Sequence, residues 1–163
     1  MMREPPLAAR TRSEAEMTTM TKRITREECN CFALRQAARF VTQLYERHLS
    51  QADVTAAQFT ILSRLANRPD ATAAELSDDL VMDRTTLVRA LQPLQRDGLV
   101  LTAAAEHDTR TLVYRLSAAG ARRYEKAHAL WLEAQAEFEQ HMKRDRAKAL
   151  RAELFALTKA AGG

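Results

Sequence analysis

Asp83-Arg-Thr-Thr-Leu-Val-Arg89 lies at the centre of the stretch that decides the fold, residues 71–116. If these residues form a helix, Leu87, Leu91 and Leu94 recur at steps of three and four residues and line one face. The arginines and threonines then fall on the other side. A helix divided in this way packs its leucines against a core and presents its polar face to a partner such as a DNA groove.

The residues around this helix carry start and stop signals. Thr72-Ala-Ala-Glu75 has the pattern of a capping box and predicts a short helix that ends near Leu80. Val81-Met82 then forms a turn, and Asp83 is a suitable N-cap for the second helix. Asp97-Gly98 ends that helix, because glycine readily adopts the left-handed conformation at a helix terminus.

Two strands are predicted directly after this helix pair. Residues 99–102 and 111–116 are rich in β-branched and apolar side chains, and a polar-tipped loop over residues 103–110 joins them. Two short helices, a tight turn and a hairpin together describe a winged helix-turn-helix. The second helix of such a unit enters the major groove of DNA.

Two helices are predicted before this unit. Thr25-Arg-Glu-Glu28 fits a capping box for a long first helix with a broad apolar face over residues 25–49. Thr55-Ala-Ala-Gln58 is another box, and it starts the second helix. That helix ends close to Pro69, because proline cannot continue it.

Two further helices are predicted after the hairpin. Ser117 opens one that runs to about Met142 and, at about 1.5 Å rise per residue, spans roughly 35–40 Å. Asp145 caps the last helix. One face of that helix carries Leu150, Leu154 and Leu157. Together with the first helix, these elements present more apolar surface than one small domain covers, which predicts a homodimer.

The composition agrees with a mostly helical globular protein. The 163 residues suit one domain, 46% are hydrophobic, and only four glycines and four prolines occur. We expect a single domain over residues 25–160. Within it, residues 55–116 form the winged helix-turn-helix, and residues 25–49 and 117–160 form dimerisation helices. Residues 1–24 are expected to be a disordered tail, because they show no sustained periodicity.

The distribution of charge favours a nucleic acid partner. The net charge is only +4, but between residues 83 and 126 eight basic residues stand against five acidic ones. The basic residues are Arg84, Arg89, Arg96, Arg110, Arg115, Arg122, Arg123 and Lys126. The excess of positive charge is therefore concentrated in the winged helix-turn-helix and the start of the helix after it.

The predicted DNA contacts come from the second helix and the hairpin. The candidates on the helix are Arg84, Thr85, Thr86 and Arg89. Arginine donates two bonds to guanine, and threonine contacts bases or phosphates. In the hairpin, Asp108 is expected to hold the guanidinium of Arg110 by a charge-assisted bond, so that Arg110 enters a minor groove. Thr72 is a further candidate contact.

Other functional classes have little support in the sequence. It contains no glycine-rich phosphate loop, nucleophile elbow or metal-spaced cluster, so we predict no enzyme, catalytic residue, metal or cofactor. No run approaches the roughly 18 apolar residues of a membrane span, and no secretory signal is recognised, so a soluble intracellular protein is expected. A helical protein-interaction module is the remaining alternative. It explains the long helices but not the charged hairpin.

Five segments, in this order, resemble the multiple-antibiotic-resistance regulator (MarR) family of bacterial transcription factors. They are Ala74-Glu-Leu-Ser77, Asp83-Arg-Thr-Thr86, Leu94-Gln-Arg-Asp-Gly-Leu-Val100, Asp108-Thr-Arg110 and Leu116-Ser-Ala-Ala-Gly120. The resemblance covers about residues 31–160. It implies a homodimer in the bacterial cytosol, bound to a near-palindromic site in double-stranded DNA. Such a protein is usually a repressor, released by a small ligand or by oxidation. The resemblance also implies groove-reading roles for Arg84, Thr85, Thr86, Arg89 and Arg110.

A small aromatic or carboxylate ligand is one expected effector. The residues proposed to line its pocket, between the first, second and fifth helices, are Phe32, Arg35, Tyr45, His48, Phe59 and Trp131. They offer apolar walls and a few polar anchors. The alternative is that they are ordinary core and interface residues.

Oxidation of Cys31 is the alternative signal. Cys31-Phe-Ala-Leu34 resembles the segment around the reactive cysteine of organic-hydroperoxide-sensing members, in which a tyrosine fourteen residues later bonds the sulfur, as Tyr45 is spaced here. Phe59 stands where those members have a second tyrosine, and no third cysteine exists as a resolving partner. A bridge to Cys29 is not expected, because side chains two residues apart point in different directions. The alternative to oxidation sensing is that Cys31 is a small buried apolar residue.

Overall fold

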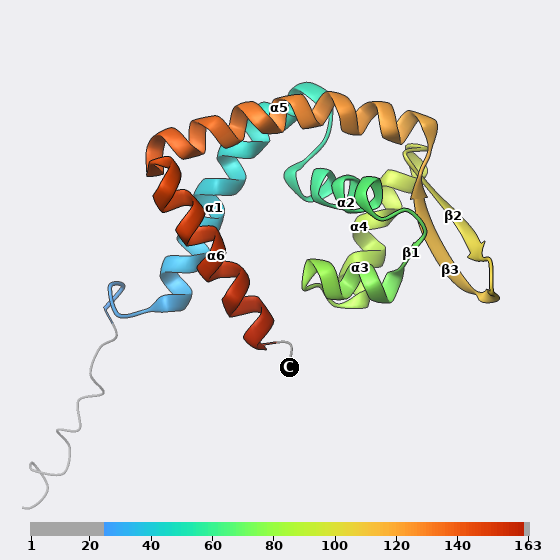
Figure 1. Cartoon of the computed structure of the whole chain (residues 1–163), viewed down its shortest axis with the longest axis horizontal. Helices are drawn as coiled ribbons and strands as arrows, with labels where there is room; N and C mark the ends of the chain where they lie inside the picture. The colour runs from blue at the N-terminus through green and yellow to red at the C-terminus, as the bar shows by residue number, and fades with distance from the viewer. Residues whose placement is uncertain (1–24, 162–163) are drawn as a thin grey trace, which may run out of the picture. The chain divides into compact units, whose positions relative to one another are not determined.

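The structure, a computed structural model, describes residues 25–161 (Figure 1). The predicted disordered tail, residues 1–24, lies outside the described residues. The described part of the chain divides into two compact units, which meet between Ala38 and Arg39. Within residues 25–161, none of the helices has the length and apolar character needed to cross a membrane.

Helices dominate the described residues, and a small antiparallel sheet accompanies them. The helices are α1 (Asn30–Leu49), α2 (Ala56–Asn67), α3 (Ala73–Leu80), α4 (Arg84–Arg96), α5 (Ala118–Met142) and α6 (Arg144–Ala161), with a single 3-10 turn, η1 (Ser50–Ala52), after α1. The strands are β1 (Ala71–Thr72), β2 (Val100–Ala105) and β3 (Asp108–Leu116). The predicted fold class, mainly α with a small β-hairpin wing, is confirmed.

The capping boxes that open α2 and α3 form as predicted. The Thr55 hydroxyl accepts the backbone N–H of Gln58 at 3.1 Å, and the Gln58 side chain accepts the Thr55 N–H at 2.9 Å. Thr72 and Glu75 make the same reciprocal pair at the start of α3. These boxes satisfy backbone donors that a helix start would otherwise leave unpaired, and so they fix where both helices begin.

The first helix begins later than predicted. The Glu28 carboxylate does accept the backbone N–H of Thr25, at 3.3 Å, but the backbone of these residues closes a turn in which the Glu28 N–H donates to the Thr25 carbonyl at 3.2 Å. The helix starts at Asn30, after Cys29, whose Sγ accepts the N–H of Phe32 at 3.4 Å. The predicted start at residue 25 is wrong, because the turn uses up the capping groups.

The sheet contains one more strand, and a longer hairpin, than the sequence predicted. Its order is β1-β3-β2, with all pairs antiparallel, and Ala71 faces Tyr114 while Val100 faces Leu116. The polar loop predicted over residues 103–110 is wrong, because β2 and β3 continue through it to a turn at residues 106–107. The register shifts between residues 104 and 105, so the pairing of the two strands is irregular next to the tip.

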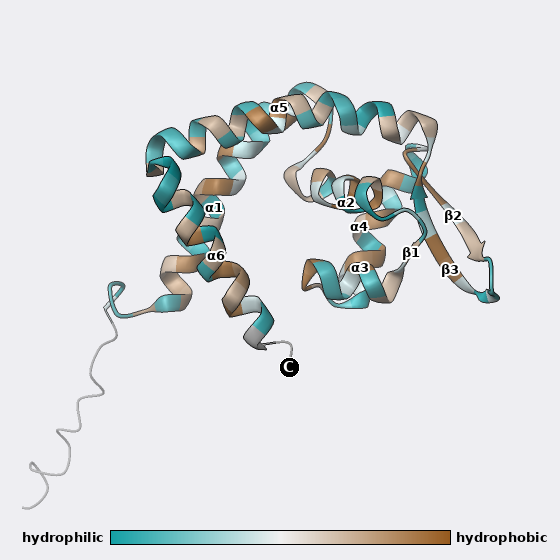
Figure 2. Cartoon of the chain, in the orientation of Figure 1, coloured by the Kyte–Doolittle hydropathy of each residue, from teal (hydrophilic) through white to brown (hydrophobic). Residues whose placement is uncertain are grey.

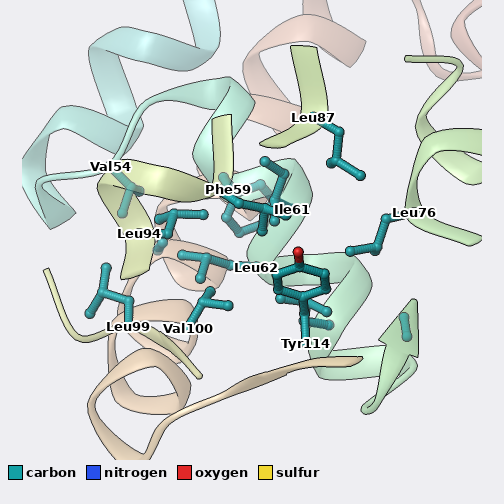
Figure 3. Close-up of a cluster of buried hydrophobic side chains, with 14 of the residues drawn as sticks. Val54, Phe59, Ile61, Leu62, Leu76, Leu87, Leu94, Leu99, Val100 and Tyr114 are labelled. Carbon is teal, nitrogen blue, oxygen red and sulfur yellow. The ribbon is translucent and has the colours of Figure 1, made fainter. Parts of the chain in front are cut away.

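The core of the second unit lies between α2, α4 and the sheet (Figure 3). Ile61 and Leu62 of α2 pack with Leu94 of α4, and all three are fully buried. Leu87 and Leu91 of α4 are also buried, which confirms the predicted leucine face. The exposed polar face of α4 is thus held in place by the residues on its opposite side.

The helices after the hairpin differ in how they begin. Ser117 caps α5 as predicted, since its hydroxyl accepts the Gly120 N–H at 2.9 Å, and the helix ends at Met142 as expected. Asp145, predicted to cap the last helix, lies instead in its first turn. The residue before α6, Lys143, has a positive φ of 66°, and this reverses the chain between the two helices.

Candidate DNA-binding interface

The N-terminus of α4 is organised by Asp83. Its Oδ1 accepts the backbone N–H of Thr86 at 2.9 Å, and its Oδ2 accepts the Thr86 hydroxyl at 2.5 Å. These two bonds, the one from the hydroxyl being the stronger cause, lower the pKa of Asp83 below its ordinary value. The predicted N-cap is confirmed. In addition, the Thr86 hydroxyl donates its one hydrogen to the Asp83 carboxylate.

The outer face of α4 carries the other predicted contacts. Arg84, Thr85 and Arg89 are exposed. Their side chains make no hydrogen bond or ion pair within the part of the chain that the structure describes. The helix therefore presents two free guanidinium groups and a free hydroxyl on the side opposite its buried leucines.

Thr72 lies at the start of α3, where its hydroxyl has two partners. It accepts the N–H of Glu75 at 3.2 Å and donates to Glu75 Oε2 at 2.9 Å. The side chain is half-buried. The Thr72 hydroxyl donates its hydrogen and uses one lone pair in the helix cap. A contact with DNA would therefore have to use its remaining lone pair.

The hairpin tip is arranged differently from the prediction. Asp108 Oδ1 accepts the backbone N–H of Arg110 at 3.0 Å, and Oδ2 accepts the Thr111 hydroxyl at 2.6 Å. These bonds, that from Thr111 first, lower the pKa of Asp108. The carboxylate thus shapes the backbone and does not hold the Arg110 guanidinium, because the nearby N–H forms a local turn at less entropic cost. Arg110 is exposed, and its guanidinium has no partner among residues 25–161.

Ion pairs divide the eight basic residues of this region into two groups. Arg115 bonds Asp70 at 2.8 Å and Arg96 bonds Asp97 at 3.1 Å. Arg123 donates to the carbonyl of Ala52 at 3.1 Å. Within the described residues, the basic side chains left without such partners are Arg84, Arg89, Arg110, Arg122 and Lys126. Sequence spacing does not reveal this division, because Arg115 and Asp70 lie far apart in the chain.

A side-chain bond that the sequence did not predict joins α4 to the hairpin. Gln95 Nε2, in the last turn of α4, donates to Thr102 Oγ1 of β2 at 2.6 Å. Both residues are exposed. This bond links the first strand of the hairpin to the last turn of α4.

Comparisons with known proteins agree with this geometry. A model described as "MarR family" matches residues 52–111, which contain α3, α4 and most of the wing. The transcriptional regulator MosR of M. tuberculosis, solved in complex with DNA, has 34% sequence identity and a TM-score of 0.74, over 83% of this chain and 97% of that one. The chain belongs to the MarR family.

Two other MarR-type proteins support this assignment. A mutant of MarR from E. coli, solved with operator DNA, has 26% identity and a TM-score of 0.70, over 77% of this chain and 90% of that one. An organic hydroperoxide resistance transcriptional regulator of Bacillus subtilis (strain 168) is 29% identical over 97 residues. That match spans 60% of this chain and 66% of the relative, slightly less than two thirds of its length. The predicted class, a DNA-binding transcriptional regulator and not an enzyme, is confirmed.

The predicted effector residues of this MarR-family chain are only partly brought together. Phe59 is buried and stacks on Trp131, with ring centroids 6.1 Å apart. Tyr124 and His128 extend the same aromatic cluster on the α5 side. Phe32 and Arg35 are exposed residues of α1. Of the apolar side chains proposed as pocket walls, only Phe59 and Trp131 therefore pack against each other in this structure.

Two of the polar anchors proposed for the same pocket, Tyr45 and His48, are bonded to α5. The Tyr45 hydroxyl donates to Gln135 Oε1 at 2.5 Å, and burial raises its pKa. His48 Nε2 lies 2.8 Å from Glu137 Oε2 and His48 Nδ1 lies 3.6 Å from Glu133. Sequence reasoning missed these partners, because they lie about ninety residues further along the chain.

Cys31 lies on the exposed surface of α1, and Cys29 is half-buried. The alternative prediction of a buried apolar Cys31 is wrong, since the first turns of α1 pack none of their side chains deeply. An exposed thiol is open to oxidants in solution.

Proposed function

We propose that this MarR-family protein is a repressor that binds a near-palindromic operator in double-stranded DNA as a homodimer. The observation that carries the proposal is the division of α4. Leu87, Leu91 and Leu94 anchor it in the core, while Arg84 and Arg89 remain free on its other face. Such a helix is held rigidly and still offers donors to a major groove.

Each part of the interface has a proposed role. Arg84 and Arg89 contact base edges or phosphates from α4, with Thr85 and Thr86 beside them. Arg110 enters the minor groove from the wing, whose tip Asp108 shapes. Thr72 approaches the backbone from the start of α3. Residues 55–116 form the reading unit in this proposal, and the helices around it form the dimer interface.

The apolar surface of the flanking helices supports the homodimer. Hydrophobic residues recur along α6 (Figure 2), although Ala147 is its one buried residue between positions 144 and 159. The large hydrophobic side chains exposed on α5 and α6 are Leu132, Leu150, Leu154, Phe155 and Leu157. Apolar side chains gathered on exposed helices favour association, because burial removes that area from water.

Selection from a random duplex library tests this function directly. Two copies of α4 related by a two-fold axis should enrich a near-palindrome with half-site centres about 10 base pairs apart. Sedimentation of the protein with and without the selected duplex should give one dimer in both cases. Enrichment of a single, non-repeated half-site by a monomer would contradict the proposal.

A small aromatic or carboxylate ligand is the release signal that we propose first. The stacked Phe59 and Trp131, together with His128, form an aromatic cluster between α2 and α5. A flat ligand could enter this cluster by separating its rings. Benzoate is a suitable probe: it should weaken operator binding by wild-type protein, and Trp131→Ala should abolish the effect while leaving binding without benzoate intact.

Oxidation of Cys31 is the second candidate signal. Two observations favour it: the thiol is exposed in the single chain, and the Bacillus subtilis relative is named for organic hydroperoxide resistance. Treatment with an organic hydroperoxide should then release DNA from wild-type protein but not from Cys31→Ser. Cys29→Ser serves as the matched control. Unchanged binding of the treated wild type would eliminate this signal.

A further inference from the structure

The first turn of α4 contains a hydroxyl whose hydrogen is already committed. We propose that Asp83 and Thr86 form an acceptor-only pair, which selects a base that presents an amino group in the major groove, adenine or cytosine. This inference rests on the proposed function, because it assigns a specificity to one position of the reading helix.

The argument begins with the bonding capacity of the two side chains. A threonine hydroxyl has one hydrogen and two lone pairs. In Thr86 the hydrogen lies on Asp83 Oδ2 at 2.5 Å, a short distance typical of a hydroxyl bound to a carboxylate. The other oxygen of Asp83 accepts the Thr86 backbone N–H at 2.9 Å. The carboxylate is therefore held on two sides, and what Thr86 and Asp83 still offer to solvent is lone pairs only.

This restriction decides which DNA atoms the pair can bond. Phosphate oxygens are acceptors, so the Thr86 hydroxyl cannot bond them without giving up Asp83. The O6 and N7 atoms of guanine and the O4 atom of thymine are also acceptors. The major-groove donors are the N6 amino group of adenine and the N4 amino group of cytosine. A carboxylate beside the hydroxyl adds to this selection, since it repels the acceptor atoms.

The neighbouring side chains give the opposite preference or none. The Arg84 guanidinium carries donors only, which suit guanine. The Thr85 hydroxyl has no partner within residues 25–161, so it rotates freely and serves as a donor or an acceptor. The first turn of α4 thus presents a donor group, an unrestricted hydroxyl and an acceptor pair. Of the two threonines, only Thr86 has its hydrogen fixed.

The test combines a protein change with the removal of a single amino group from DNA. Thr86→Val keeps the branched shape of the side chain and removes the hydroxyl, whereas Thr86→Ser keeps the hydroxyl. In selections from a random library, Thr86→Val should lose the preference at one position in each half-site, by about fivefold, the value of one ordinary hydrogen bond. Thr86→Ser should retain it.

The amino group is then removed at that position of the selected operator. Adenine is replaced by purine, or cytosine by 2-pyrimidinone, each of which lacks the amino group. Wild-type protein should lose about fivefold in affinity, and Thr86→Val should lose nothing further. Equal losses for both proteins would overturn the inference. It would also be overturned if the preference lost in Thr86→Val were for guanine or thymine. Thermal unfolding of Thr86→Val shows that the variant is folded.

The two proposals fail in different ways. If wild-type protein enriches no DNA sequence, the proposed function is wrong. If wild-type protein enriches an operator and Thr86→Val enriches the same one with the same strength at every position, only the acceptor-pair inference is wrong.

Discussion

Gly120 lies directly against the backbone of Leu99. A Cβ atom at position 120 would stand 2.0 Å from the Leu99 carbonyl oxygen. The Ser117 N–H donates to that same oxygen at 3.0 Å, and the Ser117 hydroxyl donates to the Gly98 carbonyl at 2.6 Å. The start of α5 is therefore fixed to the segment that follows the recognition helix. Movements of the long helix and of α4 are expected to be linked through this junction.

Gly120→Ala should destabilise the fold strongly. The new methyl group meets backbone that is bonded on both sides and cannot move aside, so we expect a loss of about 3 kcal/mol, at the upper end for overpacking. Urea denaturation monitored by circular dichroism measures it. Gly98→Ala is the matched control: it has φ +69° but nothing within 4 Å of the added atom. That variant should lose only about 1–2 kcal/mol, the cost of a left-handed residue. Equal losses would show that contact with Leu99 is unimportant.

Arg110→Ala should weaken operator binding without affecting stability. The side chain is exposed and makes no bond with residues 25–161, so its removal costs the fold nothing. Loss of one minor-groove arginine is expected to reduce affinity about tenfold or more. Gel-shift titration at fixed salt measures the affinity. Arg110→Lys, which keeps the charge but not the planar guanidinium, should recover part of it. Full affinity of a folded Arg110→Ala dimer would refute the wing assignment.

Arg84 and Arg122 should differ in what they contribute. Arg84 is at the N-terminus of α4, so Arg84→Ala should change base preference in the half-site. Arg122 is exposed in the second turn of α5 and should act on phosphate, so Arg122→Ala should weaken every sequence about equally and reduce the salt slope by about one. Library selections with both variants test this difference. If both alter the base preference, or neither does, the distinction fails.

Glu137 should make stability depend on acidic pH. Bonds from His48 at 2.8 Å and from Arg47 at 2.7 Å lower the pKa of this carboxyl from 4.5 to about 2. Because the folded pKa lies below the unfolded one, the charged form stabilises the fold above about pH 4.5. That contribution disappears as the pH falls toward 2.

Urea denaturation over this range measures the effect. The wild type should lose stability more steeply than Glu137→Gln as the pH falls from about 5 to about 2. Glu133→Gln is the control, because Glu133 is 3.6 Å from His48 and 62% exposed, and it should follow the wild type closely. Parallel curves for wild type and Glu137→Gln would contradict the assignment.

Local signals in the sequence predicted much of this fold. The boxes at Thr55 and Thr72 and the caps at Asp83 and Ser117 depend on residues three apart, so the sequence alone contains both partners. The buried leucine face of α4 was also predicted, from leucines at steps of three and four residues. The box at Thr25 led to a wrong prediction of where the first helix starts. Thr25 and Glu28 do pair, but they close a turn, and the helix begins after Cys29.

Features that depend on distant partners were not predictable in this way. β1 is two residues long and exists only because it pairs with Val113 and Tyr114 of β3. The acid partner of Arg115 is likewise remote in sequence. At the wing, Asp108 had two possible partners in Arg110, its guanidinium and its backbone N–H. The sequence pattern does not distinguish these two partners. In the structure Asp108 bonds the backbone N–H, which is closer and more rigidly held than the guanidinium.

The salt dependence of operator binding tests the central claim most directly. A dimer that places free arginines of α4 and the wing on DNA displaces several counterions. The logarithm of the binding constant should therefore fall linearly with the logarithm of salt concentration, with a slope of roughly −4 or steeper. Fluorescence anisotropy with a labelled operator duplex, from low to physiological salt, gives this slope. A slope near zero, or no saturable binding at low salt, would contradict the assignment of α4 and the wing as the DNA-binding surface.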